Sequence, residues 1–491
     1  MGLGATGKFG NMAGLAPAWS WAGQTRNPYA RLIFLLITVS VLLLFPSRLA
    51  NVLLLSFSIF IALMATLRLL AVLITINSGH IRVDTHVSPD IVWPKFTLLI
   101  PLYREAHMVT SLMKHLSAID YPKDRLDIVL ITEADDLPTC QAVTHQLREP
   151  FRIFEVPPSE PRTKPKALNA ALIATPASQR GDIITIYDAE DRPHPRQIKQ
   201  AALKFMAEPE VAAIQAPLGY YNDQENILTA LFGLEYAALF HVWNPALAKL
   251  GLPFTLGGTS NHIRREVIEQ CGGWDAHNVT EDADLSFRIA AMSRQGHRLK
   301  IGTISLPTEE EAVNNYTDWT AQRSRWLKGF MQTGSVHMRF QKLAPDGGRF
   351  SMLARIKNLF ALYITVGATL LAAYLHVPSL IIMSGIYIAT FYEIISLQWT
   401  LILIVIMMTG YSASILIAII GALRAGKSHL VKYAIFMPLY WLLYFRPALI
   451  AIYEIITAPS HWRKTTHKGG LNSEHLPKDD LPLEPTKTPL I

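Results

Sequence analysis

Long apolar runs on both sides of a polar stretch are the feature that most constrains the fold of this chain. Two such runs come first, at Arg31–Phe45 and Asn51–Ile76. Four more follow the polar stretch, at Ile356–Leu375, Leu380–Ile395, Trp399–Leu423 and Tyr433–Ile456. A helix that crosses a bilayer needs about 20 mainly apolar residues. The pattern therefore predicts six spanning helices, two before and four after a soluble domain.

The composition agrees with a membrane protein and argues against a nucleic-acid partner. Hydrophobic residues make up 50% of the 491 residues and charged residues only 17%, against about 25% charged residues in soluble domains. The net charge of +7 suits anionic lipid and a negatively charged substrate, and the basic residues are not gathered in one domain. The two cysteines, Cys140 and Cys271, have no metal-ligand spacing, which indicates free thiols in a reducing compartment.

Basic residues near the apolar runs predict the orientation, because cytoplasmic loops are rich in lysine and arginine. With six helices, three basic groups fall on the cytoplasmic side: Lys8, Arg26 and Arg31; Arg355 and Lys357; Arg463, Lys464 and Lys468. A fourth group falls in an external loop, against the rule: Arg424, Lys427 and Lys432. Either this loop is an exception or one run is re-entrant, and the Arg446-Pro447 pair makes the last run a candidate for re-entrant or kinked geometry.

Strand and helix patterns alternate within the polar stretch. Short apolar runs typical of strands lie at Phe96–Pro101, Ile128–Ile131, Ile183–Tyr187 and Val211–Gln215. Helical patterns lie between them, for example at His107–Ala118 and Pro165–Ala174. Such alternation predicts an α/β domain with a mainly parallel sheet, in which ligands bind beyond the carboxyl ends of the strands.

An acidic turn follows the third predicted strand. Asp188, Glu190 and Asp191 place three carboxylates within four residues, and their mutual repulsion calls for a cation. Carboxylate oxygens suit Mg²⁺ or Mn²⁺, which bridge to diphosphate oxygens. The alternative is an acidic turn that caps the next helix.

Two further polar groups stand at element boundaries. Glu133 and Asp135 follow the second predicted strand, where they would hydrogen-bond to a base or a ribose, although a helix start explains them equally well. Lys164 and Lys166 open the helix before Ala174, and a helix N-terminus also favours anions. A solvated helix start is the alternative for the lysines.

Two later motifs carry acid–base and phosphate-binding groups. Thr280-Glu281-Asp282 is typical of a helix N-terminus with acids in its first turn, and a carboxylate there would also serve as a general base. Gln322-Arg323-Ser324-Arg325-Trp326 combines guanidinium groups that match phosphate with an indole that stacks on a sugar. The alternative for the second motif is a basic surface helix.

Together these motifs resemble the membrane-embedded family 2 glycosyltransferases, which include cellulose, chitin and hyaluronan synthases. The resemblance rests on Asp188-Ala189-Glu190, Thr280-Glu281-Asp282 and Gln322–Trp326 in this order, and it extends over Pro94–Lys342. A finer resemblance points to the bacterial exopolysaccharide β-glucan synthases. It rests on two segments, Gln215–Asn222 and Gly257–His262.

The resemblance implies an inverting hexosyltransferase with a GT-A domain on the cytoplasmic face and a divalent metal ion, Mg²⁺ or Mn²⁺. Asp188 and Glu190 would take the metal-binding Asp-x-Asp place, in which Glu190 departs from the usual aspartate. Asp191 is the alternative ligand. Asp282 would be the base that deprotonates the acceptor hydroxyl group.

The resemblance also implies a nucleotide-diphosphate-sugar donor and an acceptor site. Gln322, Arg325, Lys166 and Asp188 would hold the donor, and Glu133 or Asp135 would replace the early aspartate that contacts the nucleotide. The acceptor would be bound by three residues: Thr280, Glu281 and Trp326.

These expectations divide the chain into six parts. They are a cytoplasmic segment at 1–30, two transmembrane helices at 31–76, the GT-A domain at 94–312, amphipathic interface helices at 313–350, about four transmembrane helices at 354–458 and a disordered tail at 469–491. The aromatic and basic stretch after residue 313 suits helices at the membrane surface. Within this stretch, Gln322, Trp326 and Phe330 share one face of the predicted helix.

The leading hypothesis from the sequence is a processive β-glycosyltransferase of the plasma (inner) membrane. It would polymerise a sugar, UDP-glucose by resemblance, into an exopolysaccharide and move the polymer through its own helices. The alternative is a glycosyltransferase that adds one or a few sugars to a membrane lipid. A transporter or scaffold is the third hypothesis, but it leaves the acidic motifs unexplained. The short chain leaves room for periplasmic or accessory subunits.

Overall fold

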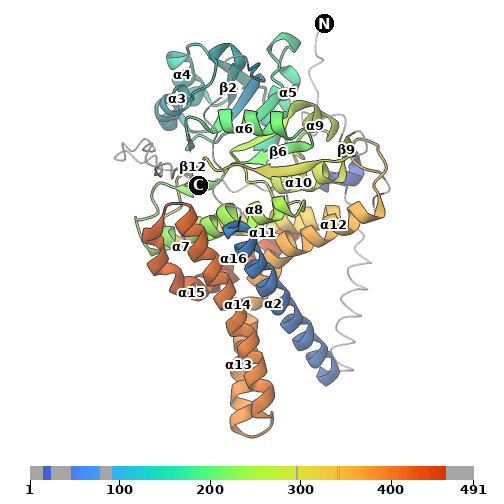
Figure 1. Ribbon diagram of the computed structural model, residues 1–491. Helices are drawn as coiled ribbons and strands as arrows, with labels where there is room; N and C mark the ends of the chain where they lie inside the picture. The colour runs from blue at the N-terminus through green and yellow to red at the C-terminus, as the bar shows by residue number, and fades with distance from the viewer. Residues whose placement is uncertain are drawn as a thin grey trace, which may run out of the picture.

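The computed structural model describes residues 15–23, 46–77, 91–294, 297–339, 341 and 343–459. Figure 1 shows an α/β domain above long helices that point away from it. Several sequence predictions concern segments outside the described residues. These are the helix Arg31–Phe45, the tail 469–491 and the basic residues Lys8, Arg26, Arg31, Arg463, Lys464 and Lys468.

A seven-stranded sheet forms the centre of the α/β domain, in the order β11-β6-β8-β4-β1-β2-β3. β8 runs antiparallel to both of its neighbours, and every other adjacent pair is parallel. The strands are β1 (Phe96–Leu102), β2 (Leu126–Glu133), β3 (Phe151–Val156), β4 (Ile183–Ile186), β6 (Val211–Gln215), β8 (Asn261–Arg264) and β11 (Lys300–Thr303). The predicted fold class, an α/β domain with a mainly parallel sheet beside membrane-type helices, is confirmed.

The strands that the sequence predicted are those buried on both faces. Alternate residues of β1 enter two separate hydrophobic clusters, with Leu99 on one face and Leu98 and Ile100 on the other, as the two-residue period of a strand requires. The sequence missed β3 and β11, which are the sheet edges, and β8, which is central but polar. His262 of β8 is buried and lies 2.7 Å from the Thr185 hydroxyl group.

Helices cover both faces of the sheet. One cluster contains residues of α3 (Val109–Ser117), α4 (Leu137–Gln146) and α6 (Gln197–Ala207). The other contains residues of α5 (Lys164–Ala174), α8 (Asn244–Lys249), α9 (Arg265–Gln270) and α10 (Glu281–Ala291). α7 (Ile227–Ala238) belongs to a third cluster, which joins the domain to the long helices.

A smaller sheet connects the acidic turn to the chain that leads toward the membrane helices. Its order is β5-β12-β7, with β5 at Arg192–Pro193, β7 at Leu218–Tyr220 and β12 at Thr308–Glu310. β12 pairs antiparallel with β5 and parallel with β7. Glu309 and Glu310 are therefore held next to the residues that follow Asp191.

The stretch predicted as interface helices at 313–350 contains one long helix, α11 (Tyr316–His337). It contacts α10 of the domain and the helices α13 (Ala368–Phe391) and α16 (Phe445–Thr457). Trp319, Lys328 and Gln332 are completely buried. α11 therefore lies inside the junction between domain and membrane helices, not on an open membrane surface.

Three helical stretches in the described part of the chain are long and apolar enough to cross a membrane. They are Leu54–Ile76 of α2 (Pro46–Ile76), Met352–Phe391, and α14 (Leu397–Arg424). The bent pair Ser428–Leu442 and Phe445–Thr457 makes a fourth if it counts as one span. Large apolar side chains point outward from α13 and from the turn after it, and Phe391 and Ile394 are both more than three-quarters exposed, as expected of residues that face lipid.

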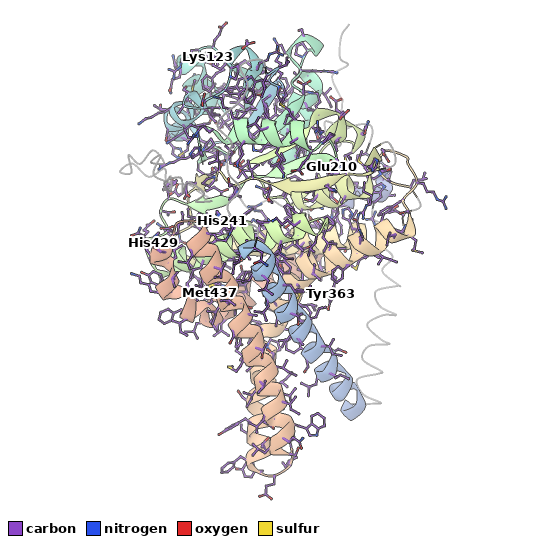
Figure 2. The ribbon with its side chains drawn as sticks, in the orientation of Figure 1. Lys123, Glu210, His241, Tyr363, His429 and Met437 are labelled. Carbon is purple, nitrogen blue, oxygen red and sulfur yellow. The ribbon has the colours of Figure 1, made fainter. Side chains whose placement is uncertain are left out.

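The prediction of four helices after the domain is wrong because two of the predicted runs form one helix. α12 (Met352–Leu362), a π-helical turn at Tyr363–Gly367 and α13 follow each other without a break. The predicted gap between Leu375 and Leu380 lies inside α13, which contains Pro378. Proline is tolerated inside membrane helices because neighbouring groups satisfy the freed backbone. Figures 1 and 2 show α12 along the lower side of the domain and Tyr363 beside α2.

The basic loop after α14 lies on the same side as the α/β domain, not on the opposite side where six spanning helices would place it. Lys427 donates hydrogen bonds to Glu309 at 2.6 Å and to the Tyr220 carbonyl group at 2.7 Å. His429, labelled in Figure 2, lies 3.0 Å from Asp223. With one crossing fewer, the loop no longer violates the lysine and arginine rule.

The last apolar run turns back toward the domain. It forms a 3₁₀ helix at Ser428–Phe436, then α15 (Met437–Leu442) and α16, with a bend of 41° before α16. Its far end also meets α11, because Gln332 donates to the Pro459 carbonyl group at 2.9 Å. Both ends therefore contact the domain side, which favours the re-entrant alternative for this run.

The short N-terminal segment that the structure describes also binds to the domain side. Asp275 accepts hydrogen bonds from the Ser20 hydroxyl group at 3.0 Å and from the Trp21 amide at 2.7 Å. Arg339, beyond the end of α11, donates to the Ala18 carbonyl group at 3.0 Å. Residues 15–23 therefore lie on the same side as the basic loop.

This topology predicts that the α13–α14 turn and the basic loop are exposed on opposite sides of the membrane. Ser396→Cys and Ser428→Cys each place a thiol at an exposed position, and the native Cys140 and Cys271 are buried. A membrane-impermeant maleimide applied to one side of sealed vesicles should label only one of the two variants. The unmodified protein is the control, and labelling of both variants from the same side would contradict the topology.

Candidate active site

A cavity of about 720 Å³ lies beyond the carboxyl ends of β1, β2 and β4. Tyr103, Glu133 and Asp188, which end or follow these strands, line its upper part. The same cavity continues between the long helices, where Arg68 of α2 and Tyr411 of α14 line it. One cavity therefore joins the edge of the sheet to the interior of the membrane helices.

The acidic turn divides its side chains between the cavity and the protein interior. Asp188 and Glu190 line the cavity, whereas Asp191 is buried beneath it. The Asp191 carboxylate accepts hydrogen bonds from the Asp188 amide at 2.7 Å and from the Thr259 hydroxyl group. Asp191 thus stabilises the turn, and the two outer carboxylates face the cavity.

Burial and repulsion act together on this turn. Burial raises the pKa of Glu190 well above its usual range, and the neighbouring charges of Asp188 and Glu105 raise it further. Burial also raises the pKa of Asp191, with Asp188 and Glu190 adding to the effect. The site is therefore short of positive charge.

Lys164 is the cation that the structure places against the acidic turn. Its ammonium group contacts the Asp188 carboxylate and donates to the Gly258 carbonyl group at 2.7 Å. Burial lowers the pKa of Lys164, but the carboxylates of Asp188 and Glu281 outweigh this effect and raise it to about 12. Lys164 is consequently charged at neutral pH and faces the cavity.

Asp188 and Glu190 fit a divalent metal ion. No group of three or more His, Cys, Asp or Glu side chains suited to a metal occurs in the part of the chain that the structure describes. Mg²⁺, however, is commonly bound by one or two carboxylates together with substrate phosphates. Two cavity-facing carboxylates whose negative charge is only partly offset by Lys164 match that donor set.

Glu281 and Asp282 begin α10 and also line the cavity. Burial raises the pKa of Asp282 to about 6, while its hydrogen bond from the Ala283 amide and the charge of Lys164 act in the opposite direction. Burial and repulsion from Asp282 raise the pKa of Glu281 to about 8. Asp282 is therefore mostly ionised at pH 7 and is a stronger base than an ordinary aspartate.

Two glycines bring these motifs close together. The Asp282 carboxylate and the Lys164 ammonium group each lie 3.8 Å from the position that a Cβ on Gly258 would occupy, so they are within twice that distance of each other. A Cβ on Gly329 of α11 would lie 2.4 Å from the Thr280 side chain. Close packing at Gly329 fixes the start of α10 against α11, and Thr280 serves this contact.

Four of the five residues of the Gln322–Trp326 motif on α11 line the cavity. Gln322, Arg325 and Trp326 all line the cavity. Burial lowers the pKa of Arg325, and the carboxylates of Glu281 and Asp282 oppose that shift. Arg323 also lines the cavity, and it donates to Glu235 at 2.6 Å and 3.1 Å.

Aromatic rings surround the predicted stacking residue. Trp326 lies nearly parallel to Tyr236, with ring centroids 6.4 Å apart, and edge-on to Phe232 at 6.2 Å. Phe330, one turn further along α11, also lines the cavity and packs against a small hydrophobic cluster. The cavity therefore has an aromatic wall beside the acidic residues.

The predicted nucleotide-binding residues are only partly brought together. Glu133 lines the cavity and forms an ion pair with Lys166 at 2.9 Å. Lys166 is completely buried under Glu133 and is not among the cavity-lining residues. Asp135 lies nearer the surface, where it pairs with Arg162 at 2.7 Å.

Sequence reasoning missed many residues of the cavity, and Lys164 and Glu310 are two charged examples. Lys164 was considered only as part of a basic helix start, because Lys166 two residues later carries the same charge. Glu310 of β12 also lines the cavity, and its buried Oε1 atom has no hydrogen-bond partner among the described residues. Burial raises the pKa of Glu310 well above its usual range, and the charges of Asp191 and Glu190 add to this. Its Thr-Glu-Glu-Glu context gave no signal that one of the three acids turns inward.

Several known proteins are similar to this chain. The β-monoglucosyldiacylglycerol synthase of Synechocystis sp. is 25% identical over 259 residues, which are 52% of this chain and 52% of that protein. The probable glucomannan 4-β-mannosyltransferase 7 of Oryza sativa is 24% identical over 278 residues, 55% of this chain and 45% of that protein. The chain thus spans about half the length of the curated relatives it matches.

A solved structure of Pyrobaculum calidifontis mannosyltransferase PcManGT, in complex with GDP-Man and Mn²⁺, is also similar. It is 22% identical with a TM-score of 0.46, and the match covers 76% of this chain and 98% of that chain.

The family itself is shown by a match to residues 183–449, which are more than half of the chain. The matched family is described as glycosyl transferase family group 2, and its range includes the acidic turn, Asp282 and the Gln322–Trp326 motif. The predicted family resemblance is confirmed at this level. The chain belongs to glycosyl transferase family group 2.

Proposed function

We propose that this protein transfers a hexose from a nucleotide-diphosphate sugar to a hydroxyl group of a membrane lipid, with inversion at the anomeric carbon. The observation that carries the proposal is the single cavity, which contains Asp282 and the acidic turn at one end and lies between apolar helices at the other. A soluble donor would enter at the sheet edge, and a lipid acceptor would enter from the bilayer.

The donor diphosphate would bind among Asp188, Glu190, Lys164 and Arg325. A divalent ion held by Asp188 and Glu190 would supply positive charge to the leaving diphosphate. Lys164 and Arg325 supply charge from the protein itself, and a guanidinium group matches phosphate in a bidentate manner. The Gln322 side-chain NH₂ would donate a hydrogen bond to the diphosphate, while its oxygen, which lacks a partner within the described residues, would accept one from a sugar hydroxyl group.

Asp282 would remove the proton from the attacking hydroxyl group. A displacement in one step inverts the anomeric carbon and needs one base opposite the leaving group, whereas retention by double displacement needs a carboxylate nucleophile as well. The raised pKa of Asp282 suits this role, because a base works best when its pKa is close to the working pH. Trp326 would stack on a sugar ring, with Glu281 beside it.

Two observations favour a lipid acceptor. The lower part of the cavity is lined by apolar residues of membrane helices, including Phe57 and Phe60 of α2 and Ile364 near α13. One relative bears the name β-monoglucosyldiacylglycerol synthase. A mono- or oligosaccharide attached to a lipid would therefore be the product.

A processive polysaccharide synthase is the second candidate. A relative named as a probable glucomannan mannosyltransferase and the aromatic residues Trp326, Tyr411 and Trp441 in the cavity lining favour it. Its support from six spanning helices is weaker, because the described residues contain three, or four with the bent pair. UDP-glucose and a β-glucan product remain a prediction.

The catalytic domain would face the cytoplasm. The three or four apolar helices indicate a membrane protein. The hydrogen bond from Lys427 to Glu309 holds the basic loop on the domain side. Because positively charged loops stay on the cytoplasmic side, the domain would meet nucleotide sugars there.

Product analysis tests the proposed function directly. The purified protein, given a panel of UDP- and GDP-hexoses with Mg²⁺ or Mn²⁺ and lipid micelles, should convert one donor into a product that extracts into organic solvent. Mass spectrometry of that product should show one or a few hexoses on a lipid. A long polymer that stays in the aqueous phase and yields to a linkage-specific glucanase would support the processive candidate instead.

Asp282→Asn should abolish the proton transfer and leave the fold intact. We expect kcat to fall by about 10²–10⁴-fold, the usual contribution of a general base, while nucleotide binding is retained. Release of nucleoside diphosphate measures the rate, and thermal unfolding checks the fold. Asp120→Asn, a surface carboxylate paired with Lys199, is the matched control and should retain full activity. An active Asp282→Asn variant would exclude this role.

The pH dependence should report the raised pKa of Asp282. Protonated Asp282 cannot accept a proton, so kcat/KM should fall about tenfold per pH unit below its pKa. Because burial raises that pKa to about 6, the acidic limb should lie near pH 6. The residual activity of Asp282→Asn should lack this limb. A limb near pH 4, the range of an ordinary aspartate, would contradict the assignment.

A further inference from the structure

We propose that Arg68 and Ser414 form a binding site for the phosphate group of an anionic lipid at the membrane end of the cavity. This inference deepens the proposed function by naming the class of acceptor, a lipid that carries a phosphate apart from the attacked hydroxyl group. The two residues belong to different helices, α2 and α14, and both line the cavity that also contains Asp282.

Arg68 lacks the anionic partner that a cation in a membrane helix requires. Its Nη1 atom donates a hydrogen bond to the Ser414 hydroxyl group at 2.7 Å. No carboxylate pairs with it among the residues that the structure describes. A charged side chain inside a membrane span is costly and is retained where it meets a partner or marks a binding pathway. An anion in the cavity would offset that cost.

The guanidinium group is held in a fixed place by a tight helix crossing. A Cβ on Gly410 would lie 2.7 Å from the Ile61 side chain, so α2 and α14 approach each other closely there. One turn later, Ser414 donates to the Gly410 carbonyl group at 2.7 Å and accepts from Arg68. The Arg68 side chain is therefore directed by α14 and does not extend freely along the membrane surface.

Arg68 lies inside the apolar stretch Leu54–Ile76 of α2 and not at its end. The domain end of α2 is marked by Thr75, whose hydroxyl group also contacts the Val242 carbonyl group at 3.3 Å. Arg68 lies seven residues earlier on the helix, about 10 Å deeper at a rise of 1.5 Å per residue. A lipid phosphate would therefore reach Arg68 through the cavity that this residue lines.

The surroundings of Arg68 supply a place for acyl chains. Phe57, Phe60, Ile61 and Met64 of α2 line the same cavity, and their spacing puts them on one face of the helix with Arg68. A phosphate at the guanidinium group with chains along this face matches a phospholipid. A neutral diacylglycerol would leave Arg68 without its anion, and a sugar phosphate in water would leave the apolar face empty.

Lipid binding by the full chain in detergent provides the test, with phosphatidylglycerol as the probe and native mass spectrometry as the readout. Wild-type protein should retain phosphatidylglycerol in preference to diacylglycerol. Arg68→Gln should weaken retention by about tenfold or more, the usual loss for a charge-assisted hydrogen bond. Arg68→Lys should lose less, because it keeps the charge. Arg446→Gln removes an exposed arginine that is not among the cavity-lining residues and should bind as wild type does.

Three results would overturn the site. They are equal retention by wild type and Arg68→Gln, an equal preference for diacylglycerol, and full competition by water-soluble glycerol phosphate, which would identify a site for free anions. Thermal unfolding of each variant shows whether the fold is retained, and Arg68→Lys tests the charge if Arg68→Gln does not fold.

Lipid binding and sugar transfer separate this inference from the proposed function. Asp282→Asn should abolish transfer but still bind phosphatidylglycerol. Arg68-dependent binding without transfer to any lipid would leave the site standing and overturn the function. Transfer to diacylglycerol with the same KM in wild type and Arg68→Gln would leave the function standing and overturn the site.

Discussion

Repulsion among buried carboxylates is the interaction on which the rest of the candidate site depends. Eight acidic residues line one cavity: Glu105, Glu133, Asp188, Glu190, Glu235, Glu281, Asp282 and Glu310. Burial is the main cause of their raised pKa values where a shift is resolved, and their mutual charge adds to it. Such a cluster favours whatever brings positive charge into the cavity, first Lys164 and Arg325 and then a divalent ion with its diphosphate. Burial in the same cavity raises the pKa of Asp282 to about 6, so the proposed donor binding and proton removal would both depend on this low-polarity environment.

The fold keeps these charges close by assembling them from separate parts of the chain. The parallel strands place Glu133 and Asp188 at one edge of the sheet, and β12 of the smaller sheet adds Glu310 to the same cavity. α10 and α11 then meet at Gly329 without room for a Cβ, which fixes Asp282 relative to Arg325. Because α11 is also bound to α16 through the buried pair Lys328–Glu454 at 3.0 Å, the membrane helices share in positioning the site.

The sequence predicted what depends on local pattern and missed what depends on tertiary contacts. Buried parallel strands, the acidic turn and the family motifs were readable because each is a run of neighbouring residues. The choice between Lys164 and Lys166 was not readable, since it depends on which side of the first turn of α5 faces the cavity. β8 is central yet polar, and the partners of its side chains lie on other strands. The helix count failed at Pro378, because proline suggests a break in a sequence but not within a packed membrane helix.

The polarity of the cavity changes along its length, and this gradient constrains the reaction more than any single residue does. Charged groups surround the end at the sheet edge, where a nucleotide sugar would enter from water. Mainly apolar side chains of α2 and the neighbouring helices surround the other end, apart from a few polar groups such as Arg68 and Ser414. A nucleotide sugar bound beside a base is exposed to hydrolysis unless water is excluded and the acceptor arrives by another route. An acceptor that enters from the bilayer meets both conditions, because its own chains fill the apolar end while its hydroxyl group reaches Asp282.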